Sequence, residues 1–102
     1  MIVRRTQLSR EQLEALIHEE SKDTSKLFFT KHVEEQMRSR RITKACVLET
    51  LRAGRNRRRP EPNPMKGAVE CKMAYFSAGH RVAVIVAVSN DPGLIIVTAM
   101  YA

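Results

Sequence analysis

The chain has 102 residues, enough for one compact domain (residues 1–102) with a single modest core. Its hydrophobic content of 43% excludes a disordered composition, and no apolar run reaches the roughly 20 residues of a membrane helix. The first residues lack an apolar signal segment, so we expect a soluble, cytoplasmic protein without a membrane partner. Cys46 and Cys71 are too few and too far apart for a zinc site, and we expect two buried thiols.

The net charge of +7 is concentrated in one segment. Residues 31–66 contain eleven Lys or Arg and four Glu, whereas bases and acids balance in the rest of the chain. Most of these bases are arginines, whose planar guanidinium suits phosphate better than an ammonium does. The block therefore predicts a polyanionic partner, RNA or another nucleic acid. A solvated surface or a basic loop without a ligand is the alternative.

Three helices are predicted in the first half of the chain. Each has apolar residues at helical spacing and begins at a residue type that caps helix N-termini. A short apolar run, Leu27–Phe29, leads into the second helix as an extended segment. The helices are expected over 9–20, with a capping box of Ser9 and Gln12, over 30–40, capped by Thr30, and from Thr43 to a stop at Gly54.

Strands are predicted in the second half. Prolines at 60, 62 and 64 leave either an edge strand, paired through Arg59, Glu61 and Asn63, or a mobile loop. Three antiparallel strands follow at 69–75, 82–88 and 94–101, and the second is apolar on both faces, as a central strand should be. We expect an α+β fold, with N-terminal helices packed on a twisted, mainly antiparallel sheet of three to four strands. The predicted core consists of Val33, Met37, Val47, Leu48, Leu51, Val84 and Val86.

The stretch FTKHVEEQMRSRRIT, residues 29–43, could carry chemistry. On a helix, His32, Gln36 and Arg40 form one stripe at the boundary between buried and exposed faces. His32 lies in the first turn, where the helix dipole favours the neutral imidazole that a general base requires. A boundary histidine without a role is the alternative.

Two further residues, His80 and Tyr101, lie at strand ends. A turn histidine and a packed aromatic are the plain interpretations of them. No glycine-rich phosphate loop and no metal-binding signature is present, so we expect neither a nucleotide cofactor nor a metal.

The same stretch, followed by a helix with VLETLRAG and a last strand with IIVTAMY, resembles the bacterial family of domains of unknown function numbered 4258. The resemblance covers residues 28–101 and leaves 1–25 as an N-terminal helical extension. It implies a RelE-like fold, among metal-independent ribonucleases that include barnase and colicin-type tRNA nucleases. The family pattern has arginine where this chain has Gln36, which removes a cation from the stripe. The matching residues are His32, Met37, Arg40, Ile42, Thr98 and Tyr101.

The resemblance implies a toxin-like endoribonuclease that cleaves RNA by attack of the 2′-hydroxyl on the adjacent phosphate. His32 would be the base, Arg40 would clamp the phosphate, and Tyr101 would be an acid or a phosphate contact. An acidic antitoxin or immunity-type protein is the implied partner. The alternative is a nucleic-acid- or protein-binding module on the same fold without turnover, which Gln36 favours. Six residues are predicted to hold nucleic acid, namely Arg38, Arg41, Arg57, Arg58, Arg59 and Lys66.

Overall fold

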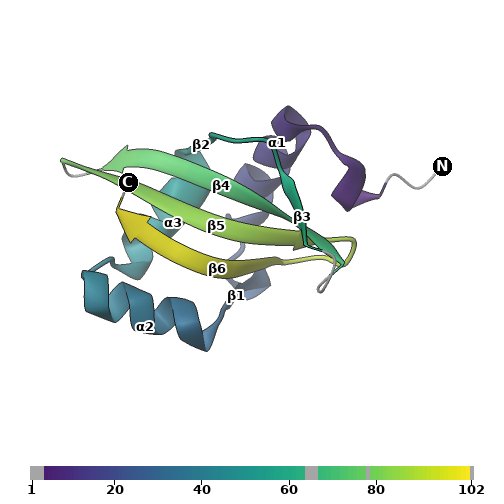
Figure 1. Ribbon diagram of the computed structural model, residues 1–102. Coiled ribbons are helices and arrows are strands. Elements are labelled where there is room, and N and C mark those ends of the chain that lie inside the picture. Colours follow the sequence, from purple (N-terminus) through teal and green to yellow (C-terminus); the bar gives the residue numbers. More distant parts are fainter. Residues whose placement is uncertain (1–3, 64–66, 78, 102) are drawn as a thin grey trace.

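The computed structural model describes residues 4–63, 67–77 and 79–101, and in this part of the chain three α-helices pack on a six-stranded mixed sheet (Figure 1). Short 3₁₀ turns cover Arg5–Gln7 and Thr24–Lys26. The α+β class and the helix-on-sheet packing are confirmed. The helices are α1 (Arg10–Glu20), α2 (Lys31–Arg40) and α3 (Lys44–Ala53), and the strands are β1 (Leu27–Phe29), β2 (Arg55–Asn56), β3 (Glu61–Asn63), β4 (Ala68–Ser77), β5 (His80–Ser89) and β6 (Leu94–Tyr101).

The helices begin where the sequence predicts. The Ser9 hydroxyl oxygen accepts a hydrogen bond from the Gln12 N–H, and the Ser9 N–H donates to Gln12 Oε1. Together these two bonds form the predicted capping box. Thr30 and Thr43 cap α2 and α3 through their hydroxyl oxygens. Gly54 is the C-cap of α3, and a larger residue does not fit there because an added Cβ would lie 2.3 Å from the Thr50 carbonyl oxygen.

The strands follow the order β1-β6-β5-β4-β2, and β3 also pairs with β4, so β5 is central as predicted. Of the two alternatives for the proline-rich segment, the edge strand is found as β3, antiparallel to β4. It begins at Glu61, so the predicted pairing through Arg59 is wrong, and Pro64 and Lys66 lie outside the described residues. The predicted three to four strands were too few. β1 is the predicted extended segment Leu27–Phe29, but its parallel pairing with β6 was not predicted. β2 was missed because two residues are too short to show a period.

The two faces of the sheet differ. Residues such as Met73, Val84 and Val86 point toward the helices and are fully buried, and the other predicted core residues are buried except the half-buried Leu48. In Figure 1, α1 and α3 lie behind the sheet and α2 runs beside β6. The opposite face carries Lys72, Phe76 and their neighbours, and no helix of the described ranges covers it. We call it the uncovered face.

The segment before α2 is tied to the sheet by a buried ion pair. Arg5 donates to both carboxylate oxygens of Glu20, with the shorter bond at 2.7 Å, and Glu20 also accepts the Gly93 N–H. Within the described ranges, no helix combines the length and apolar character that crossing a bilayer demands.

Candidate nucleic-acid interface

The predicted stripe on α2 lies against an open edge of β6. β1 pairs only with Leu94–Ile96, so the second half of β6 lacks a strand neighbour on that side among the described residues. α2 replaces this neighbour. The Ala99 N–H donates to Gln36 Oε1 over 3.2 Å, and Arg40 Nη1 donates to the Ala99 carbonyl over 2.6 Å. Gln36 and Arg40 of the stripe therefore supply hydrogen-bond partners to both backbone polar groups of Ala99 at this strand edge.

The same contacts determine which atom of Gln36 faces the His32 ring. Because Gln36 Oε1 accepts from Ala99, the amide nitrogen of Gln36 faces His32 Nε2 at 3.0 Å and must donate to it. In this contact Nε2 is the acceptor of the hydrogen bond. His32 is exposed, but its Nε2 lone pair is occupied.

Tyr101 belongs to a different group of side chains. Its hydroxyl donates to the Arg41 carbonyl over 3.1 Å, and its ring centre lies 5.3 Å from that of His80. Arg41 is the C-cap of α2 with a positive φ of 57°, which turns this carbonyl toward the end of β6. Tyr101 is paired with Val82 across the two strands, and His80 is two residues from Val82 on β5. Both side chains therefore lie on the same side of the sheet as Val82, the side that the helices cover.

The predicted catalytic residues do not meet at one point. His32 and Arg40 lie on the same flank of α2, whereas Tyr101 contacts Arg41 beyond the other end of the helix. At a rise of roughly 1.5 Å per residue, His32 and Arg41 are roughly 13 Å apart along the helix axis. The Tyr101 hydroxyl is therefore held at the C-terminal end of α2, whereas His32 lies in the first turn of the helix.

A basic hollow lies on the uncovered face. A cavity of about 240 Å³ is lined by Arg57, Arg58, Lys72, Ala74 and Arg81. Ala74 forms its floor and the other four residues are cations. We call this cavity the basic groove.

The register explains why these residues meet. Lys72 and Ala74 are two residues apart on β4 and so lie on the same face of the sheet. Arg81 of β5 is paired with Phe76, which lies on that face as well. The Arg57 N–H donates to the Lys72 carbonyl over 3.0 Å, which continues the β2 pairing and sets Arg57 beside Lys72. The cations of the basic groove thus come from two central strands and one edge segment.

Few carboxylates neutralise the cations of the basic groove. None of its described lining residues is acidic, and one of its cations, Arg58, forms a long ion pair of 3.7 Å with Glu61. Glu70 accepts from Asn63 rather than from a cation of the groove. The Arg58 Nε is buried and has no hydrogen-bond partner in the structure. The groove is therefore poised for an anion.

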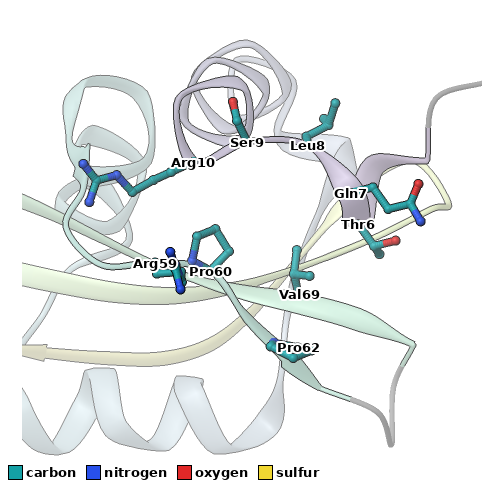
Figure 2. A pocket seen from close by; sticks show the side chains of 9 residues that line it. All are labelled: Thr6, Gln7, Leu8, Ser9, Arg10, Arg59, Pro60, Pro62 and Val69. Atoms are coloured by element: carbon teal, nitrogen blue, oxygen red, sulfur yellow. The ribbon is translucent and has the colours of Figure 1, made fainter.

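The remaining predicted contacts are dispersed. Arg59 follows Arg58 in the chain but lines a separate cavity of about 590 Å³, where it faces the N-terminal segment with Pro60 (Figure 2). Arg38 lines a hollow of about 200 Å³ beside Phe29. Lys66 lies outside the described residues.

Sequence reasoning missed Lys72 and Arg81. A signal was present, because the period of two from Ala68 onward places Lys72 on the face opposite the apolar residues, together with Ala74. Arg81 could be assigned to that face only through the register of β4 and β5. That register depends on the turn between them, which the sequence does not fix in detail.

Neither cysteine is in a disulfide: Cys71 is buried and Cys46 is half-buried. Burial raises the pKa of the Cys71 thiol to about 11, although a hydrogen bond from Asn56 and the charge of Arg58 oppose the shift. Over the ranges that the structure describes, no three His, Cys, Asp or Glu side chains gather into a group that could hold a metal ion.

The fold and these surfaces define a basic α+β domain with one helix-covered and one uncovered sheet face. The chain belongs to the family described as Domain of unknown function (DUF4258), whose model matches residues 29–101. The resemblance found in the sequence is thereby confirmed at the level of this family. Comparison with curated proteins and with solved structures gave no match.

Proposed function

We propose that this protein binds RNA through the basic groove. The observation that supports the proposal is the set of four cations, Arg57, Arg58, Lys72 and Arg81, around one cavity. Four positive side chains held together repel one another, and an anionic ligand removes this cost. Arginine forks suit phosphate oxygens, so a phosphodiester backbone fits the groove best.

The proposal predicts which arginines contribute. Arg57→Gln and Arg81→Gln should each weaken binding of a short RNA and reduce the slope of log affinity against log salt by about 0.7, the value for one phosphate on a single strand. Arg59→Gln is the matched control because Arg59 faces a different cavity. Equal losses for Arg57→Gln and Arg59→Gln, or binding that ignores salt, would reject the basic groove as the binding site.

A second candidate function is metal-independent cleavage of RNA, as in the RelE-like ribonucleases. The observation that favours it is an exposed His32, with Nε2 facing the Gln36 amide nitrogen, on the same flank as Arg40. The 2′-oxygen would attack the adjacent phosphorus while the 5′-oxygen leaves, giving a 2′,3′-cyclic phosphate and a 5′-hydroxyl. His32 would take the 2′ proton once the substrate hydroxyl replaces the Gln36 amide at Nε2.

Arg40 would stabilise the charge on the phosphorane, since its bond to Ala99 uses one of five N–H donors. Tyr101, beyond the far end of α2, would contact a neighbouring phosphate rather than the scissile one. An acidic protein that neutralises such an activity would present carboxylates to the same cations.

Cleavage is tested with purified protein and RNA in the presence of a chelator. Wild type should release products with cyclic phosphate ends, and His32→Gln should slow the reaction by about 10²–10⁴. DNA of the same sequence is the control, because it lacks the attacking hydroxyl. If wild type leaves RNA intact, the protein binds without cleaving.

A further inference from the structure

An exposed aromatic side chain stands beside the basic groove. Phe76 of β4 is 67% exposed, the highest value among the large hydrophobic side chains that the structure describes as exposed. It lies on the uncovered face, directly opposite Arg81 of β5. Because Arg81 also lines the basic groove, the ring and the cations are immediate neighbours.

The surroundings of Phe76 leave its ring accessible. The next residue pair along the two strands is Ala74 with Ala83, and both alanines point to the same face as Phe76. Methyl groups are too short to cover an aromatic ring that stands on the sheet. Because the ring is 67% exposed, a planar ligand can reach it.

We propose that the uncovered face binds single-stranded nucleic acid, with one base stacked on Phe76 and the adjoining phosphate in the basic groove. The inference rests on the proposed function and names the form of nucleic acid that is bound. An aromatic ring beside a cationic groove is the arrangement with which proteins hold unpaired strands.

The geometry separates single strands from duplexes. In a duplex the faces of the bases are covered by their neighbours, so only an unpaired base can stack on Phe76. Duplex RNA can still offer phosphates to Arg57, Arg58 and Lys72. The cations alone thus predict binding of either form, whereas the ring predicts a preference for the single strand.

The test compares a short single-stranded RNA with the blunt duplex of the same sequence at several salt concentrations. Phe76→Leu should weaken single-strand binding about tenfold, a usual effect of removing one stacking aromatic, and leave duplex binding unchanged. Phe76→Tyr keeps a ring and should bind like wild type. Phe28→Leu is the matched control, since Phe28 is a 57% exposed phenylalanine of the same face but belongs to β1, the strand at the far edge of the sheet from β4.

The salt slope distinguishes the two proposals. Phe76→Leu should keep the slope of wild type because it removes no phosphate contact. If Arg57→Gln weakens RNA binding and Phe76→Leu does not, or if duplex binds as tightly as single strand, the stacking site is wrong while the basic groove stands. If wild type binds neither form, or only an acidic protein, both proposals fail.

Discussion

Arg40 donates a hydrogen bond of 2.6 Å to the carbonyl oxygen of Ala99. The residue that the sequence predicts to bind phosphate thus also joins α2 to β6. The N–H of the same alanine is taken by Gln36. Both polar groups of one edge residue of β6 are therefore satisfied from α2. This gives Gln36, where the family pattern has arginine, a role in the fold.

Removing this hydrogen bond should cost stability. Arg40→Met keeps the length of the side chain but leaves the Ala99 carbonyl without its donor, and the free energy of unfolding should fall by about 1–2 kcal/mol. Urea unfolding followed by circular dichroism measures the change. Arg38→Met is the control, because Arg38 is an exposed residue of the same helix, and it should change stability by less than about 0.5 kcal/mol. Equal effects for the two variants would show that the Ala99 contact contributes nothing.

The ion pair of Glu20 predicts a larger effect. Glu20 is 8% exposed and binds both Arg5 and the Gly93 N–H, so Glu20→Ala leaves the largely buried guanidinium without its counter-charge and the Gly93 N–H without its acceptor. The expected loss in unfolding free energy is about 3 kcal/mol. Glu19→Ala removes a neighbouring exposed carboxylate paired with Lys22 and should cost no more than about 0.5 kcal/mol. A Glu20→Ala protein as stable as Glu19→Ala would mean that the N-terminal segment is not anchored in this way.

A pair of adjacent substitutions on β5 tests the assignment of the two sheet faces. Val86 is fully buried under the helices, whereas Ile85 points to the uncovered face and is only partly buried. Val86→Asp should unfold the domain because an unpaired buried carboxylate costs several kcal/mol, roughly. Ile85→Asp should leave a folded protein with a reduced melting temperature. The reverse ranking would show that the helices cover the other face.

Much of the fold could be predicted from local chemistry. Ser9, Thr30 and Thr43 predict the starts of three helices, because a capping hydroxyl bonds a backbone N–H only two or three residues further along the chain. The three long strands were found because an alternating pattern in the first, and nearly continuous apolar runs in the other two, extend over seven or more residues. The apolar run of β1 predicts an extended segment but not its parallel pairing with β6, and the two residues of β2 show no local pattern.

The candidate site was predictable only in part, for the same reason. The spacing of His32, Gln36 and Arg40 fixes their common flank, but not that the open edge of β6 lies beside it. Arg58 and Arg59 are adjacent in the chain, yet they line different cavities because β2 and β3 leave a break between them at the edge of β4. A run of arginines carries no information about that division.

The Cys71 thiol predicts how stability changes at alkaline pH. In the unfolded chain it should ionise near its ordinary value of 9.0, whereas in the folded protein burial raises its pKa to about 11. Folding therefore favours the protonated thiol. This contribution is fully present below about pH 9 and is lost as the pH rises from 9 through 11.

The measurement is urea unfolding at intervals between pH 8 and about pH 11, in wild type and in Cys71→Ala. The difference between the two proteins isolates the thiol from lysines and tyrosines that titrate in the same range. Wild type should lose about 2 kcal/mol more than Cys71→Ala over this interval, since each pKa unit corresponds to about 1.4 kcal/mol. Alkylation gives an independent check, because the half-buried Cys46 should react with iodoacetamide well before Cys71 in the folded protein. Parallel pH curves, together with equal alkylation of both cysteines, would place Cys71 outside the core and contradict the register of β4 against β5.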